Sequence, residues 1–210
     1  MSRATTPGRL LAAALAFCTS GAAAQSADDG SRWSASINAS YYAMRDEPDF
    51  GVVVAAVNRG PLRFEARHNY EARHATSAFV GWKVAGGEAL SYEVTPIAGG
   101  LFGAAHAGIV GVEASAAYRA FDAYIEAEYV HDNGDAAGHY VYAWSELGFR
   151  PFEWLRIGIV GQRTRIVHTS RDLQRGPFVQ LAWGKVSVGV YAFNPDAASR
   201  YAVISIAASF

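Results

Sequence analysis

Cysteine is almost absent from this chain of 210 residues, since Cys18 is the only one. A chain with a single thiol cannot form an internal disulfide framework, and it has no thiolate cluster for zinc. Charge of either sign is also unremarkable, with 18 basic against 19 acidic residues. This balance argues against a nucleic-acid partner. Beyond residue 24 the sequence has no apolar run of the roughly 20 residues that span a bilayer as a helix.

The N-terminus has the three-part layout of a secretory signal peptide. Arg3 and Arg9 flank its start, residues 10–17 are apolar, and the small residues 22–24 offer a cleavage site. We therefore predict that residues 1–24 are removed on export. A lipoprotein anchored at Cys18 is the alternative, but the phenylalanine before it is bulky for that processing. Loss of both arginines leaves 16 basic against 19 acidic residues, a formal charge of −3.

From residue 32 onward the chain alternates apolar and polar residues with a period of two. In the clearest segment one face carries Leu62, Phe64 and Ala66, whereas the other carries Arg63, Glu65 and Arg67. Segments 121–129 and 202–210 follow the same rule. This period is that of a β-strand with one apolar and one polar face. The chain is thus predicted to be all-β.

Twelve such strands can be counted, with ten or eight as alternatives. They are predicted at 32–44, 50–58, 62–71, 76–85, 88–98, 106–118, 121–131, 139–149, 154–166, 175–184, 186–194 and 200–210. Tight turns alternate with longer polar loops, which is typical of a transmembrane antiparallel up-and-down β-barrel. We assign the barrel to residues 32–210, preceded by a short N-terminal segment at 25–31.

The aromatic residues indicate a membrane as the medium. One group adjoins the predicted short turns: Trp33, Trp82, Phe121, Phe152, Trp154, Trp183 and Phe210. Aromatic rings favour the headgroup level of a bilayer. The polar strand faces also carry too many charges for a small dry core, because burial of an unpaired charge costs several kcal/mol. Lipid outside the barrel and polar side chains inside it resolve this conflict.

These features resemble the bacterial outer-membrane β-barrel class over residues 32–210. The last strand, Tyr201–Phe210, alternates apolar residues and ends on Phe210, which resembles the signal read by the barrel-assembly machinery. In size and strand number the chain is similar to the small twelve-stranded porins for acidic sugars. The resemblance implies an outer-membrane location, with outer-membrane lipids, lipopolysaccharide and the assembly machinery as partners.

Charged residues on the polar faces are candidates to line a lumen and set ion selectivity. The basic candidates are Arg63, Arg67, Lys83 and Arg156, and the acidic candidates are Glu113, Glu126, Glu128 and Glu146. The two signs fall mostly on different strands, which predicts a transverse field across a narrow pore. The alternative is that these groups pair across the barrel and fill it, because strand number alone does not settle whether a lumen is open.

Aromatic residues and histidines offer two further candidate sites. Tyr140, Tyr142 and Trp144 share the face of Glu146 and are expected in the lumen, unless a one-residue bulge turns them to the lipid. All six histidines lie near the longer loops, where one could serve a lipid hydrolase. The available serines are Ser77, Ser145 and Ser170, with Glu71 or Asp132 as the orienting acid. No local motif joins these residues. We therefore assign no catalytic residue and expect neither a metal nor a cofactor.

The leading functional hypothesis is a small passive channel for ions or small polar solutes. The alternatives are an outer-membrane hydrolase that modifies lipid or lipopolysaccharide, and a closed barrel with a structural or surface-interaction role.

Overall fold

The computed structural model describes residues 32–134, 138–166 and 172–210. The predicted signal peptide and the segment 25–31 lie outside these residues. Thirteen strands and no helix are assigned in the described part: β1 (Trp33–Met44), β2 (Phe50–Arg59), β3 (Leu62–His68), β4 (Ala75–Trp82), β5 (Val84–Gly86), β6 (Leu90–Gly103), β7 (Ala107–Tyr118), β8 (Phe121–Asp132), β9 (Tyr140–Phe152), β10 (Leu155–Ile166), β11 (Asp172–Trp183), β12 (Val186–Phe193) and β13 (Tyr201–Ser209).

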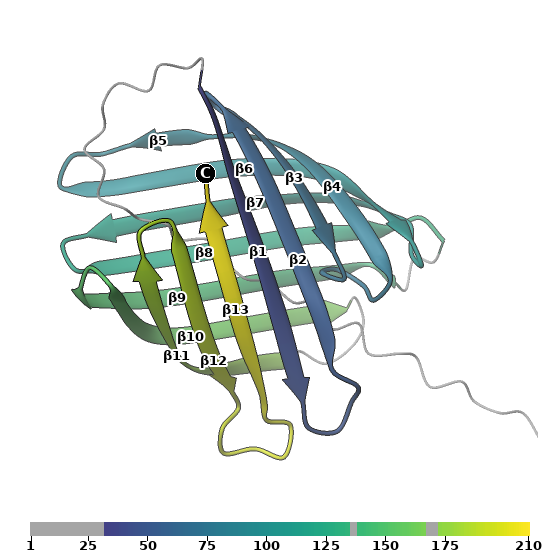
Figure 1. The fold of residues 1–210 in the computed structure, drawn as a ribbon. Coiled ribbons are helices and arrows are strands. Elements are labelled where there is room, and N and C mark those ends of the chain that lie inside the picture. Colours follow the sequence, from purple (N-terminus) through teal and green to yellow (C-terminus); the bar gives the residue numbers. More distant parts are fainter. Residues whose placement is uncertain (1–31, 135–137, 167–171) are drawn as a thin grey trace, which may run out of the picture.

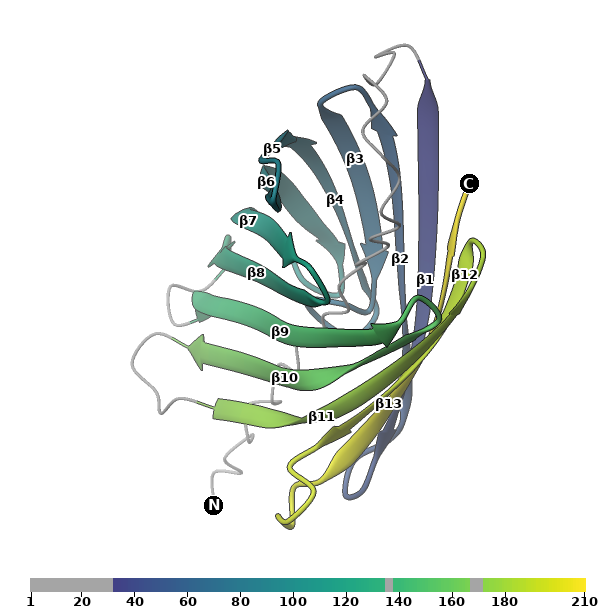
Figure 2. The ribbon, with the colours of Figure 1, turned by 90° about the vertical axis from the view of Figure 1, so that its left-hand side faces the viewer.

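The strands close into a ring in which chain neighbours pair antiparallel. β1 pairs with β13, and β4 pairs with β6, so twelve strands form the barrel and β5 is an addition that pairs only with β6. The predicted twelve-stranded antiparallel barrel is confirmed. Figure 1 shows β1, β2, β12 and β13 running steeply, whereas β6 to β10 run across them. Figure 2 shows the same crossing from the side, with the strands enclosing a common interior.

Several predicted strands differ from the structure in their extent, and the one predicted at 62–71 ends at His68. The segment predicted at 76–85 is interrupted at Lys83 and continues as the short β5, which keeps the register of β4 against β6. The Lys83 backbone N–H donates to the carbonyl of Pro61 at 2.7 Å and ends the β3–β4 ladder. The strand predicted at 88–98 continues to Gly103, across a stretch expected to be a loop. There β6 lies so close to β4 that a Cβ on Gly99 would come within 2.2 Å of the Ala78 carbonyl oxygen. Glycine therefore extends the strand by permitting close pairing.

The polarity of the barrel is the reverse of that of a water-soluble protein. Isoleucine, valine and aromatic side chains are exposed along the outer faces, including Ile125, Ile159 and Ile204. Charged side chains such as Arg67, Glu126 and Arg156 are buried inside. Closure of the ring pairs the backbone of every wall strand, which a hydrocarbon environment demands. This is the architecture of an outer-membrane β-barrel. No helix in the described part of the chain has the length and hydropathy to cross a bilayer.

Exposed aromatic rings gather at the end of the barrel where the turns are short. The two-residue turn Arg119–Ala120 and the turn at Gly184 have positive φ angles of 56° and 59° at their first residues, as tight hairpins require. The rings beside the short turns are those predicted, and all seven are exposed: Trp33, Trp82, Phe121, Phe152, Trp154, Trp183 and Phe210. Their outward orientation fits an aromatic girdle at one membrane interface.

A charge on the outer face should oppose insertion of the barrel into lipid. Ile125 lies in the middle of the outer face of β8, so Ile125→Arg should lower the free energy of unfolding in phospholipid vesicles by about 2–4 kcal/mol. Chemical unfolding with tryptophan fluorescence measures this change. Glu153→Arg, in the exposed turn after β9, is the matched control and should change it little. Equal effects of both variants would argue against lipid contact at Ile125.

Candidate functional site

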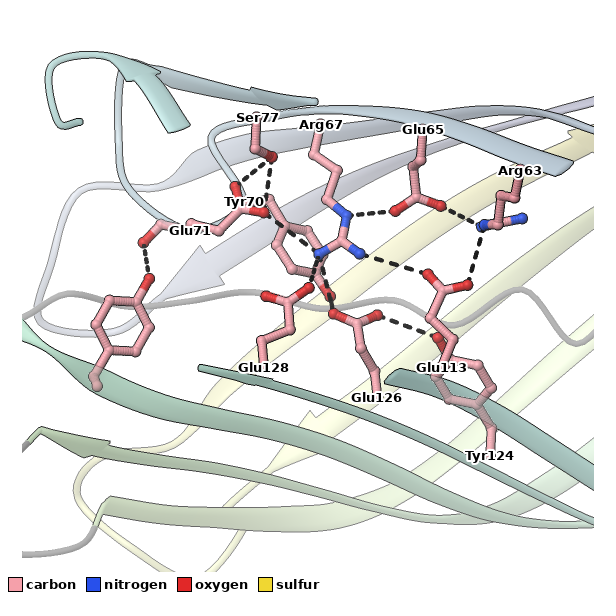
Figure 3. Close-up of polar contacts among 11 residues, drawn as sticks. Arg63, Glu65, Arg67, Tyr70, Glu71, Ser77, Glu113, Tyr124, Glu126 and Glu128 are labelled. Atoms are coloured by element: carbon pink, nitrogen blue, oxygen red, sulfur yellow. Dashed lines mark hydrogen bonds and ion pairs between the residues drawn. The ribbon is translucent and has the colours of Figure 1, made fainter. Parts of the chain in front are cut away.

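Alternation along β3 carries three charged side chains into the barrel. Arg63, Glu65 and Arg67 lie on the inner face, whereas Phe64 lies on the outer one. Around them gather residues of the β3–β4 loop and of β4, β7 and β8, which we name the Arg67 cluster (Figure 3): Arg63, Glu65, Arg67, Tyr70, Glu71, Ser77, Glu113, Tyr124, Glu126 and Glu128.

Arg67 is the centre of this cluster and is 1% exposed. Its Nη1 atom lies 2.7 Å from Glu128 and 3.1 Å from Glu126, both on β8, and 3.4 Å from Glu71. Its Nε atom pairs with Glu65 on its own strand. The guanidinium also lies over the rings of Tyr70 and Phe79, at 4.3 and 4.4 Å. One side chain therefore joins β3 to β8 across the interior and satisfies a buried charge with several partners.

The loop between β3 and β4 turns inward and supplies two members of the cluster. Asn69 and His74 adopt positive φ angles of 58° and 60°, which asparagine tolerates well. The Asn69 side chain accepts from the His74 backbone N–H at 2.7 Å and holds the loop together. Tyr70 of this loop donates to Glu126 of β8. The carboxylate of Glu71, also in the loop, lies with both oxygens 2.8 Å from Ser77 Oγ of β4. This loop therefore packs against the barrel interior.

The Arg67 cluster carries an excess of acidic groups. Two guanidinium groups, Arg63 and Arg67, face five carboxyl groups, a formal excess of three negative charges when all are ionised: Glu65, Glu71, Glu113, Glu126 and Glu128. Arg63 binds Glu65 and lies 3.1 Å from Glu113, so the second arginine also links β3 to β7. A buried group of this sign attracts cations and repels anions.

A second, smaller ion-pair group surrounds Arg156 on β10. Its Nε atom donates to Asp122 of β8 at 2.8 Å, and its Nη1 atom binds Glu146 of β9 at 2.5 Å and Gln180 of β11 at 2.8 Å. Arg150 also pairs with Asp122, at 3.1 Å. Two cations thus face two carboxylates, and this group is balanced. Its charges hold four neighbouring strands together.

Aromatic rings fill the remaining side of the interior. Trp144 packs on Phe193 with ring centres 5.5 Å apart, and Phe193 stacks on Tyr201 at 4.7 Å. The contacts continue through Tyr42 to Phe50, at 6.3 and 4.6 Å. The Trp144 indole donates to Glu146 at 3.0 Å, which connects the rings to the Arg156 group. The hydroxyls of Tyr42 and Tyr142 are buried and have no hydrogen-bond partner among the described residues.

The structure brings most of the candidate lumen residues together, but not in the arrangement expected of separated charge lobes. Arg63 and Arg67 contact Glu113, Glu126 and Glu128 directly, because β3 lies near β7 and β8. Arg156 and Glu146 form the other group, and Tyr140, Tyr142 and Trp144 are buried inside.

Lys83 does not join either group of ion pairs. It follows the end of β4 and pairs with Glu93, 3.3 Å away, at the short-turn end of the barrel, where both side chains are partly exposed. Lys83 continues the inward alternation of Ser77 and Phe79, but it lies one residue beyond the end of β4.

The residues considered for hydrolysis remain apart in the described part of the chain. Ser77 meets Glu71, but His68 faces outward and contacts Thr76, at 3.0 Å. Ser145 is exposed on the outer face of β9. The described residues also bring together no set of three histidine, cysteine or acidic side chains that could hold a metal ion. Among the described residues no hydrogen bond joins a serine to a histidine, whereas His168 and Ser170 lie outside these residues.

Sequence reasoning missed several residues of the interior. Alternation along segment 121–129 puts Asp122 on the polar face, yet it is not among the lumen candidates, although it is the main partner of Arg156. Tyr70 and Glu71 were expected at a strand end, and no local pattern marks their loop as folding inward. Tyr42 and Tyr201 alternate inward on β1 and β13, so the period-two rule could have identified them.

The contact between Arg156 and Asp122 depends on a glycine in the strand between them. A Cβ on Gly148 of β9 would lie 2.5 Å from Arg156 Nε and 2.8 Å from Asp122 Oδ1. Gly148→Ala should displace the guanidinium and lower the free energy of unfolding by about 1–3 kcal/mol, as measured by chemical unfolding. Gly108→Ala is the matched control, because nothing lies within 4 Å of its Cβ position. A Gly148→Ala barrel as stable as that control would contradict this account of the site.

Comparison with known proteins yields little at the level of sequence. No family model matches the chain, and no curated protein matches it. Among solved structures, the crystal structure of the Acinetobacter baumannii outer membrane protein Omp33 is similar at 13% identity with a TM-score of 0.41, covering 86% of this chain and 99% of that one. The assignment rests instead on the closed ring, the apolar outer surface and the buried charges: the chain is an outer-membrane β-barrel protein.

Proposed function

We propose that this protein is a passive channel of a bacterial outer membrane that is closed at rest and favours cations when open. The observation that carries the proposal is the Arg67 side chain, which crosses the interior and binds acidic groups of β8. In this proposal the chain is exported with its N-terminal signal peptide removed. The solutes are small inorganic cations and small polar molecules.

The contacts that cross the interior support a gate of small amplitude. Arg67 is held by ion pairs and by ring contacts with Tyr70 and Phe79, and no covalent bond ties it to the opposite wall. Rotation of the Arg67 side chain away from Glu128 would break the ion-pair contact between β3 and β8 and would leave the backbone ring unchanged. Side-chain rotations are fast compared with rearrangements of strands. Such a gate predicts brief openings and a small conductance.

The acidic excess of the Arg67 cluster supports a preference for cations. With five carboxyl groups against two guanidinium groups, an opened path is lined by more acidic than basic groups. Rings and lobes of carboxylates favour cations in channels. The preference should therefore depend on Glu126 and Glu128, which lie directly opposite Arg67.

A closed barrel with a structural role is the second candidate, and a specific observation favours it. Trp144, Arg67 and Arg156 are among the largest side chains of the chain, and each is at most 1% exposed. An interior packed at this density with ion pairs and rings would hold the wall strands together even if no solute ever passed.

Bilayer recordings of the purified protein separate the two candidates. The wild type should give rare, small, salt-dependent steps whose reversal potential in a salt gradient shows cation preference. In Arg63→Ala/Arg67→Ala the steps should become frequent and more cation-selective, because the acidic residues lose their counterions. Glu128→Gln keeps the shape of the side chain and removes one partner of Arg67, so it should lengthen openings and weaken the preference.

Arg59→Ala is the matched control for these recordings. Arg59 is exposed at the short-turn end, with its guanidinium over the ring of Trp33, so its loss should leave both the steps and the reversal potential unchanged. Silent bilayers from wild type and Glu128→Gln, with protein that shows the heat-modifiable mobility of a folded barrel, would reject the channel and leave the closed structural barrel.

A further inference from the structure

Three arginines lie on the outer face of the barrel near the longer loops. Arg163 and Arg165 belong to β10 and Arg175 to β11. Arg163 and Arg165 continue the outer face of β10 that carries Ile157 and Ile159, which are 41% and 62% exposed. The apolar outer face of β10 therefore ends in cationic side chains at the loop end of the strand.

Unlike the interior arginines, these three have no acidic partner among the residues that the structure describes. Each is exposed, and in the part of the chain that the structure describes no ion pair involves any of them. The same chain buries Arg67 and Arg156 only with carboxylates in contact. A guanidinium beside lipid-facing residues is costly unless an anion pairs with it. The partner of this patch should therefore come from outside the protein.

The strand register places open space at Gly161, next to the arginines, and a hydroxyl on its other side. Gly161 of β10 pairs with Arg175 on one side and with Ser145 of β9 on the other. A Cβ at Gly161 would meet nothing within 4 Å. Arg163, two residues along the same face, lies between Ala143 and Leu173. The result is a shallow place in the outer wall, floored by glycine and bordered by Arg163, Arg175 and the exposed Ser145.

We propose that this patch binds a phosphorylated headgroup of the glycolipid in the outer leaflet of the membrane. The long loops of outer-membrane barrels face the cell exterior, so the patch lies at the level of that leaflet. Guanidinium groups bind phosphate through paired N–H donors and remain charged at any physiological pH. The acyl chains of the same lipid would lie along Ile157 and Ile159 below the arginines. The proposal is independent of channel activity.

Native mass spectrometry of the protein in detergent tests the proposal with bisphosphorylated lipid A as the probe. The wild type should bind this lipid at least tenfold more tightly than its fully dephosphorylated form. Arg163→Gln/Arg165→Gln/Arg175→Gln should lose that difference, because the phosphate contacts are gone. Gly161→Leu keeps every charge and fills the shallow place, so it should also weaken binding of the phosphorylated lipid.

A second triple variant controls for total charge. Arg32→Gln/Arg59→Gln/Arg119→Gln removes three exposed arginines from the short-turn end and should bind as the wild type does. Retained binding by the folded β10–β11 triple variant would overturn the proposal, as would equal binding of the two lipid forms. Displacement of the lipid by millimolar inorganic phosphate would identify a site for soluble anions and overturn the assignment to a lipid.

Discussion

The burial of one positive charge organises the interior of this barrel. Arg67 lies between the walls and away from water, and a charge in that position is tolerated only when opposite charges and hydrogen bonds surround it. Removal of a partner from such an arrangement typically costs about 3–5 kcal/mol. The requirement draws together the inner faces of β3, β7 and β8 and the inward loop after β3. Phe79 and Tyr70 complete the surroundings by covering the guanidinium plane.

Small residues make room for this arrangement. Gly148 lets Arg156 run across β9 to Asp122, and Gly111 lies where a Cβ would meet Glu128 at 2.9 Å. In a barrel whose inner faces carry long charged side chains and bulky rings, the neighbouring strands must supply glycine or alanine. Packing of the interior therefore depends on small residues next to large ones as well as on the pairing of charges.

Much of the fold could be predicted from the sequence because a membrane barrel depends on one simple rule. Alternation with a period of two predicts which side chains face lipid. It predicts Trp144 inside the barrel and Trp33, Trp154 and Trp183 outside. The side-chain contacts within the site cannot be predicted from this alternation. Which inner residue of β3 meets which residue of β8 depends on strand tilt and on the shear of the closed ring, and no local segment encodes either quantity.

Departures from the alternation were likewise beyond local reasoning. Lys83 interrupts the segment predicted at 76–85 at the point where β4 ends its pairing with β3, and the chain resumes as β5 against β6. Tyr70 and Glu71 enter the interior because Asn69 and His74 adopt left-handed backbone angles and close the loop. Neither the end of strand pairing at Lys83 nor the inward closure of the β3–β4 loop has a period-two signature, so alternation along the chain predicts neither.

The distribution of the five tryptophans gives the barrel an internal optical probe. Trp33, Trp82, Trp154 and Trp183 are more than half exposed, whereas Trp144 is fully enclosed and its indole N–H is bonded to Glu146. Quenchers attached to lipid chains would reach the first four and leave the fifth emitting. Light emitted by Trp144 alone would therefore report on the packing of the barrel interior, separately from the membrane that surrounds it.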